Sequence, residues 1–404
     1  MVTQKGIGVL VSNFIVPGSQ LGMLGGGQLG RMFAQAAVQM GYSVVALCPD
    51  ADAPVADVAQ VITAEYEDEA ALQQLLDQTA AVTLEFENIP KVTARFVESQ
   101  GILRPGVKAL EIAQDRRLEK TFISKLNDCQ VADFRIIESE ADVLKLSQAE
   151  AKNQAKKNSD TFSFPAILKT ARDGYDGKGQ VRIAQKEELA AAWQQLGQVP
   201  CVLETMIDFE QELSILVARD VHGGCVTYLP FLNEHENHIL ARSWAGADIP
   251  QWAATAAEAA AKNIAHQLDY VGCLCVELFQ CQDRLLVNEI APRPHNSGHA
   301  TIEAYTISQF EQQVRALVGL PVIQPELRRP MLLMNLLGEN PLFPLNSRAA
   351  AEKIVQLLQL PGVHYHNYGK TEAKPGRKMG HLTLEAPTFE ALKALHQKVE
   401  QVLG

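Results

Sequence analysis

The N-terminal part of the chain alternates short apolar runs with segments whose apolar residues recur every three or four positions. The apolar runs lie at residues 19–24, 43–48, 61–66 and 81–86, and the helix-like segments lie at residues 31–41 and 67–78. Strands that alternate with helices favour a parallel sheet with helices on both faces. We therefore expect an α/β domain first.

The middle of the chain has a different pattern, in which apolar and polar residues alternate. Residues 115–137 are expected to be mostly helical, with a strand near their end, and 147–160 to form an exposed polar helix and loop. Residues 164–170 and 181–184 predict a hairpin around the glycine-rich stretch RDGYDGKGQ. Alternating runs at 201–208, 212–220, 225–231 and 238–244 predict one antiparallel set of strands.

The remaining elements are clearer still. Residues 251–268 predict a long alanine-rich helix, and 271–280 and 284–292 predict a pair of strands around a short turn. A helix should end at Gly319, and a proline-rich linker should follow at 321–330. Mixed strands and helices are expected from Met331 onward.

Composition narrows the class of protein. The chain has 404 residues, 47% of them hydrophobic, and a formal net charge of -11, which argues against nucleic-acid binding as its main role. The seven cysteines include no C-x-x-C pair, so we expect buried free thiols in a cytoplasmic protein. No apolar run is long enough to span a membrane, and residues 1–18 are interpreted as an extension without a convincing signal-peptide cleavage site.

Two glycine-rich stretches could bind phosphate. GGGQLG, residues 25–30, follows a predicted strand and precedes a helix, and Asp50 ends the next strand, so an NAD-dependent oxidoreductase is one hypothesis. The motif is weak alone, and no hydride-transfer site is evident elsewhere in the chain. RDGYDGKGQ lies between two strands instead, where a flexible hairpin with Lys178 can close over a triphosphate, and Lys169 ends the strand before it.

Acidic residues follow or interrupt several apolar strands. Glu204 and Glu212 in ETMIDFEQE could accept hydrogen bonds from an adenine amino group and from ribose, or they could belong to a solvated acidic loop. Glu277 and Glu289 lie in two strands that should pair, and two adjacent carboxylates repel unless a cation lies between them. With Asn288 they suit Mg²⁺, although separate ion pairs with Arg or Lys remain an alternative.

The stretch NEIAPRPHNSGH carries two histidines, His295 and His299. Pro294 and Gly298 disfavour a helix here, so the geometry of an H-E-x-x-H zinc site is not matched. We expect a polar loop that contacts a substrate, with structural histidines as the alternative.

Together these blocks resemble the ATP-grasp superfamily and, more narrowly, its 5-(carboxyamino)imidazole ribonucleotide synthetase family. The resemblance is carried by GGGQLGRM, LEFENIP, DGYDGKGQ, NEIAPRPHNSGH and KPGRKMGHL, in the order of that family. It implies a mixed α/β and α+β multidomain fold. After the extension at 1–18 come a Rossmann-like preATP-grasp domain at 19–114, an ATP-grasp domain at 115–325 with a subdomain boundary near 205, and a small β-rich C-terminal domain at 326–404.

The resemblance also implies a reaction. ATP phosphorylates bicarbonate to carboxyphosphate, and the amine of 5-aminoimidazole ribonucleotide captures the carboxyl group, giving ADP and phosphate in purine biosynthesis. Such chemistry requires alignment, charge neutralisation and exclusion of water. ATP, Mg²⁺ and bicarbonate are the expected small molecules, and a homodimer is the expected assembly. A formate-dependent glycinamide ribonucleotide transformylase-like enzyme and a binding module without catalysis are the competing hypotheses beside the oxidoreductase.

Site residues follow from the same resemblance. The catalytic set is Tyr175, Asp176, Lys178, His295 and Asn296. The ATP-binding set is Arg116, Lys169, Gly174, Tyr175, Asp176, Gly177, Lys178, Gly179, Gln180, Glu204, Thr205, Met206, Ile207, Glu212, His235, Asn288 and Glu289. The set that binds the ribonucleotide is Gln28, Leu29, Glu85, Lys370, Arg377 and Lys378. The Mg²⁺ ligands are Glu277 and Glu289.

Overall fold

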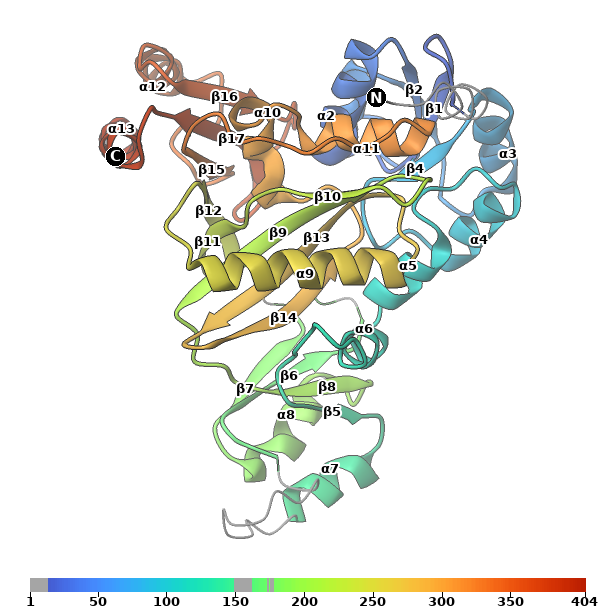
Figure 1. Cartoon of the computed structure of the whole chain (residues 1–404), viewed down its shortest axis with the longest axis vertical. Coiled ribbons are helices and arrows are strands. Elements are labelled where there is room, and N and C mark those ends of the chain that lie inside the picture. The colour runs from blue at the N-terminus through green and yellow to red at the C-terminus, as the bar shows by residue number, and fades with distance from the viewer. Residues whose placement is uncertain (1–13, 149–161, 173, 175–177) are drawn as a thin grey trace, which may run out of the picture.

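The computed structural model describes residues 14–148, 162–172, 174 and 178–404, which form three sheets and their covering helices (Figure 1). The predicted site residues Tyr175, Asp176 and Gly177 lie outside the described residues, as do the extension up to residue 13 and most of the polar stretch 147–160. No helix in the described part of the chain has the length and hydrophobicity needed to cross a membrane.

The N-terminal sheet is parallel, as its alternating pattern predicts. Its order is β3-β2-β1-β4, and its strands are β1 (Gln20–Leu24), β2 (Ser43–Cys48), β3 (Gln60–Thr63) and β4 (Val82–Leu84). Helix α2 (Gln28–Gln39) buries one face of the sheet, and α3 (Glu69–Gln78) and α4 (Lys91–Ser99) bury the other. The expectation of helices on both faces is thus confirmed.

A second, smaller sheet has the order β5-β8-β6-β7. Its strands are β5 (Phe134–Ile137), β6 (Ala166–Thr170), β7 (Gln180–Ile183) and β8 (Cys201–Thr205), covered by α7 (Glu140–Gln148) and α8 (Leu189–Gln195). Strands β6 and β7 form the predicted hairpin. Helix α6 (Arg116–Ile123) covers less of residues 115–137 than expected, because an irregular segment separates it from β5.

The largest sheet runs in the order β14-β13-β9-β11-β12-β15-β17-β16, with β10 paired to β9. Its strands are β9 (Gln211–Arg219), β10 (Cys225–Thr227), β11 (Phe231–Glu236), β12 (Ile239–Ala245), β13 (Gly272–Cys281), β14 (Arg284–Ala291), β15 (Met331–Leu337), β16 (Val363–Asn367) and β17 (Lys378–Glu385). The alanine-rich α9 (Gln251–Gln267) lies across its face (Figure 1). The strands of the C-terminal part therefore extend the central sheet.

One expectation about the middle strands is wrong. The run at 201–208 does not join the antiparallel set, because β8 pairs with β5 and β6 in the smaller sheet. Within this region β9 pairs with β10 and with β11, and the pattern did not isolate β11 as a strand of its own. A period of two shows which face of a strand is buried, but it does not reveal the partner strand.

The other elements complete the covering layers. They are η1 (Pro54–Asp57), α5 (Val107–Ala113), η2 (Lys186–Glu188), η3 (Asn296–Ala300), α10 (Thr301–Ala304), α11 (Gln309–Val318), α12 (Arg348–Leu358) and α13 (Phe389–Leu403). Helix α11 ends at Gly319 in a left-handed conformation, as predicted. It packs against α2 and against β13, so α11 lies between the N-terminal domain and the central sheet (Figure 1).

Candidate active site

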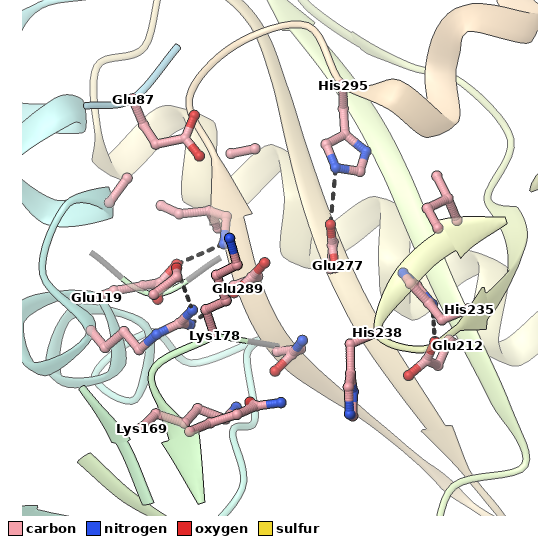
Figure 2. Close-up of a pocket in the computed structure, with 18 of the residues that line it drawn as sticks. Glu87, Glu119, Lys169, Lys178, Glu212, His235, His238, Glu277, Glu289 and His295 are labelled. Atoms are coloured by element: carbon pink, nitrogen blue, oxygen red, sulfur yellow. Dashed lines mark hydrogen bonds and ion pairs between the residues drawn. The ribbon is translucent and has the colours of Figure 1, made fainter. Parts of the chain in front are cut away.

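A cavity of about 1030 Å³ lies where the three sheets meet (Figure 2). Most of the predicted site residues that the structure describes line it. They are Gln28, Leu29, Glu85, Arg116, Lys169, Gly174, Lys178, Gln180, Glu204, Thr205, Met206, Ile207, Glu212, His235, Glu277, Asn288, Glu289, His295, Asn296 and Lys378. Gly179, Lys370 and Arg377 are absent from the lining.

Glu204 lies between two lysines at the floor of the cavity. Its carboxylate is 3.0 Å from the Lys120 Nζ and 3.2 Å from the Lys169 Nζ, and only 4% of the residue is exposed. Burial by itself would raise the pKa of Glu204, but the two lysine charges outweigh it and hold the pKa at about 2. The solvated-loop interpretation is therefore wrong for Glu204, whose carboxylate binds Lys120 and fixes Lys169 beside the cavity.

Glu277 and Glu289 are directly opposite each other in the β13–β14 hairpin, as predicted. A β-bulge follows this pair, with Asn288 as the extra residue. Successive residues of a regular strand point to opposite faces, whereas a bulge re-aims them. Asn288 and Glu289 therefore both line the cavity, and the two carboxylates and one amide come together there.

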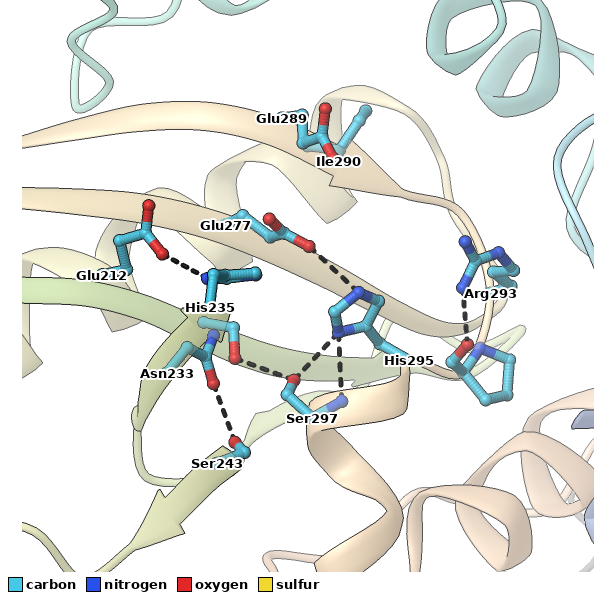
Figure 3. A network of polar contacts seen from close by, with 12 residues as sticks. Glu212, Asn233, His235, Ser243, Glu277, Glu289, Ile290, Arg293, His295 and Ser297 are labelled. Atoms are coloured by element: carbon cyan, nitrogen blue, oxygen red, sulfur yellow. Dashed lines mark hydrogen bonds and ion pairs between the residues drawn. The ribbon is translucent and has the colours of Figure 1, made fainter. Parts of the chain in front are cut away.

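Each carboxylate already has a cationic or titratable neighbour. Arg116 Nη1 lies 2.8 Å from Glu289 Oε2. His295 Nε2 lies 3.0 Å from Glu277 Oε1 (Figures 2 and 3). Burial opposes ionisation of Glu289, yet the positive charge of Arg116 holds its pKa at about 2. The ion pair that the sequence left as an alternative is thus present for Glu289.

The same residues also fit a hard divalent cation. Asn288 Oδ1 is buried, and no hydrogen-bond partner for it is found among the described residues. With the carboxyl groups of Glu289 and Glu277 beside it, this gives an oxygen-only donor set of the kind that Mg²⁺ prefers. Among the described residues, no cluster of three or more His, Cys, Asp and Glu residues is arranged to hold a metal ion.

The loop after β14 holds His295 over this hairpin (Figure 3). The His295 Nδ1 is 2.9 Å from Ser297 Oγ, which in turn lies 2.8 Å from Ser214 Oγ on β9. The ring is thereby oriented with Nε2 toward Glu277. Asn296 has both side-chain polar atoms buried without a partner among the described residues, and it lines the cavity.

His299 differs from His295. It is fully buried, its Nδ1 is 3.2 Å from Gln309 Nε2, and burial lowers its pKa well below the usual value. It does not line the cavity, so it is the structural histidine of the pair.

Glu212 lies at the far end of the cavity, on β9. Its carboxylate contacts His235 Nδ1 on the adjacent strand β11 (Figure 2). Burial would lower the pKa of His235, but the hydrogen bond and charge of Glu212 raise it overall.

On the opposite side, Glu85 occupies the start of helix α2. Its carboxylate accepts a hydrogen bond from Gly27 N, and a Cβ added at Gly27 would clash with Glu85 Oε1. The expectation that a phosphate binds these N–H groups is corrected, because a carboxylate already satisfies them. The same contact disfavours a dinucleotide there, since a pyrophosphate would face a buried acid.

The C-terminal tail brings basic residues toward Glu85. Lys370 Nζ donates to the Lys378 carbonyl at 2.7 Å, and Arg377 Nη1 donates to the Glu372 carbonyl at 2.9 Å. Burial, reinforced by the charge of Arg377, lowers the pKa of Lys370 to about 8, although Glu85 opposes this shift. Of these three predicted residues, Lys378 lines the cavity itself.

Sequence reasoning missed several residues of the cavity region. Lys120 is fully buried and donates to the Asn288 carbonyl at 2.6 Å. Glu119 accepts from Ile290 N, and burial and the nearby Glu289 raise its pKa to about 8. Arg293 pairs with Glu87 across the cavity wall. Glu87 lies within LEFENIP and Arg293 within NEIAPRPHNSGH, two motifs that carry the family resemblance. Their place in these motifs was the one sign in the sequence that both residues belong to the site.

Comparison with known proteins agrees with this architecture. Models of three domains match the chain: the ribonucleotide synthetase preATP-grasp domain at residues 19–114, the ATP-grasp domain at 134–310 and the phosphoribosylaminoimidazole carboxylase C-terminal domain at 332–395. Fold and cavity thus define an ATP-grasp protein.

Individual relatives are more specific. The N5-carboxyaminoimidazole ribonucleotide synthase of Bacillus subtilis is 38% identical over 95% of this chain and 96% of its own. The N5-carboxyaminoimidazole synthetase from Staphylococcus aureus, solved with ADP, has a TM-score of 0.84 at 33% identity, covering 96% of this chain and 98% of that one. The synthase from Aspergillus clavatus, in complex with ADP and 5-aminoimidazole ribonucleotide, has a TM-score of 0.83 at 26% identity, covering 95% and 98%. The chain belongs to the N5-carboxyaminoimidazole ribonucleotide synthase family.

Proposed function

We propose that this chain carboxylates 5-aminoimidazole ribonucleotide with bicarbonate at the expense of ATP, through carboxyphosphate. One observation carries the proposal: a single cavity joins the lysine-lined floor around Lys169 to the wall that holds Gln28, Glu85 and Lys378. A nucleotide and a ribonucleotide could therefore meet over the β13–β14 hairpin. The relatives that bind ADP alone or with 5-aminoimidazole ribonucleotide support the same two ligands.

In the part of the cavity that would bind ATP, positively charged side chains would hold the phosphates. Lys169, held by Glu204, would bind phosphate oxygens, and the loop that contains Gly174, Lys178, Gly179 and Gln180 would cover them. Thr205, Met206 and Ile207 would contact the base, and Glu212 with His235 would contact the ribose. Glu277, Glu289 and Asn288 would hold Mg²⁺, which neutralises phosphate charge when bound.

The other part of the cavity would align 5-aminoimidazole ribonucleotide, whose amine accepts the carboxyl group. His295 and Asn296 would orient bicarbonate and the ribonucleotide amine above Glu277, in a closed space where carboxyphosphate is protected from water. Lys370, Arg377 and Lys378 would neutralise the ribonucleotide phosphate, and Gln28 and Leu29 would complete this subsite. For Tyr175 and Asp176, which lie outside the described residues, contact with the substrate and bicarbonate remains a prediction from the family resemblance.

Phosphate release tests the function directly. Purified protein should release phosphate from ATP only when bicarbonate and 5-aminoimidazole ribonucleotide are both present. No release with all three substrates would reject the proposal, and formate-dependent turnover of glycinamide ribonucleotide would favour the competing enzyme.

The cellular setting belongs to the same proposal. All seven cysteines are free, which suits a reducing cytoplasm. We expect a homodimer, which light scattering after size exclusion would check.

A further inference from the structure

The tip of the β11–β12 hairpin carries an unusual residue. Glu236 and Ile239 are the last paired residues, so Asn237 and His238 form a two-residue turn. Both have positive φ, 51° for Asn237 and 67° for His238. Such turns strongly favour the pair Asn-Gly, because a side chain at the second position is strained in the left-handed region. Histidine therefore occupies a position where glycine would be less strained.

This turn lies at the cavity. His238 is a lining residue, whereas Asn237, in the same turn, is not. In Figure 2 His238 stands between the Glu212–His235 pair and the end of Lys169. A bulge between Glu234 and His235 changes the twist of the hairpin just before the tip. Strained backbone that persists beside a cavity points to a role in binding.

We propose that His238 binds the sugar–phosphate part of the nucleotide. The proposal rests on the proposed function, which places ribose at Glu212 and phosphates at Lys169. An imidazole between these two groups can donate to a ribose hydroxyl or a phosphate oxygen, which glycine cannot do. The contact between the imidazole and the nucleotide would offset the backbone strain at His238.

Three variants test this, with binding of ADP in the presence of MgCl₂ measured by calorimetry. His238→Gly should weaken ADP binding by about three- to tenfold, the loss of one hydrogen bond. Its melting temperature should not fall, because glycine relieves the strain. Asn237→Gly has the same backbone conformation but does not line the cavity, so it should bind ADP like the native protein. His238→Asn tolerates positive φ and should recover part of the affinity.

Three results of these experiments would overturn the proposal for His238. Unchanged ADP binding by His238→Gly overturns the proposal, as does a lower melting temperature with weaker binding, which indicates a structural role. A rise confined to the KM for 5-aminoimidazole ribonucleotide also overturns it, because Ile239 at the same tip approaches the tail loop at Gly376. Native protein that does not bind ADP would instead refute the proposed function itself, together with this inference.

Discussion

Glu204 shows how one buried side chain can organise a site. It holds Lys120 and Lys169 with a pKa of about 2, whereas an unperturbed Glu titrates near 4.5. Because the folded state lowers this pKa, the stabilisation is complete above pH 4.5 and is lost as the pH falls toward 2. Replacing Glu204 leaves the buried lysines without their counter-charge.

Glu204→Gln should therefore reduce the free energy of unfolding at pH 7 by about 3 kcal/mol. The difference from the native protein should shrink as the pH falls from 4.5 to 2. Thermal unfolding at several pH values measures both. A variant as stable as the native protein at pH 7 would show that the lysines do not need this carboxylate.

The amine of Lys370 is a second group whose charge changes with pH, and it does so within the pH range of ordinary enzyme assays. Its pKa is lowered to about 8, because burial and Arg377 disfavour its charge. The protonated form would bind the ribonucleotide phosphate, so the KM for 5-aminoimidazole ribonucleotide should rise as the pH increases through 8. In Lys370→Met this rise should disappear, with a higher KM at pH 7. Lys374→Met, at an exposed lysine of the same tail, should keep the native profile; identical profiles for both variants would contradict the assignment.

At the scale of the element, the β13–β14 hairpin determines which oxygen atoms meet. The register pairs Glu277 with Glu289, and the bulge adds Asn288 to the same face. The donor set thus depends on strand pairing as much as on residue type.

Glu289→Ala should abolish Mg²⁺-dependent phosphate release, by at least about 100-fold, since the loss of even an outer partner of a metal ligand costs 10- to 100-fold. The far-UV circular dichroism spectrum should stay native. Glu258→Ala on the exposed face of α9 is the matched control and should remain active. An active Glu289→Ala enzyme would refute the metal assignment.

At the scale of the whole molecule, the cavity depends on how the N-terminal sheet is held against the central sheet. The Arg293 Nη2 donates to Glu87 Oε1 at 2.9 Å, which ties the loop after β4 to the loop after β14. Burial opposes the charge of Glu87, yet Arg293 lowers its pKa overall.

A double-mutant cycle tests this link. Glu87→Gln or Arg293→Met alone should each cost about 1–2 kcal/mol of stability, less than for a fully buried pair because both side chains retain some solvent contact. The double variant should cost less than the sum of the two, since no unpaired charge remains. Strict additivity of the melting-temperature shifts would indicate that the pair does not couple the two parts.

The sequence alone determined much of this protein. Alternating strand and helix patterns predicted the parallel N-terminal sheet, the β6–β7 hairpin and the β13–β14 pair, because periodicity records which side of each element is buried. The family resemblance of its motifs named most of the lining residues in advance, from Gln28 to Lys378.

Only the tertiary structure decided which partners these residues have. The pairing of β8 with β6, the bulge at Asn288, the burial of Lys120 against Glu204 and the carboxylate of Glu85 on the glycine loop all depend on contacts between segments far apart in the chain. A local pattern does not encode such contacts, and the charge state of a buried group depends on them. For that reason GGGQLG resembled a phosphate cradle in sequence, whereas in the fold it binds an acid of its own chain.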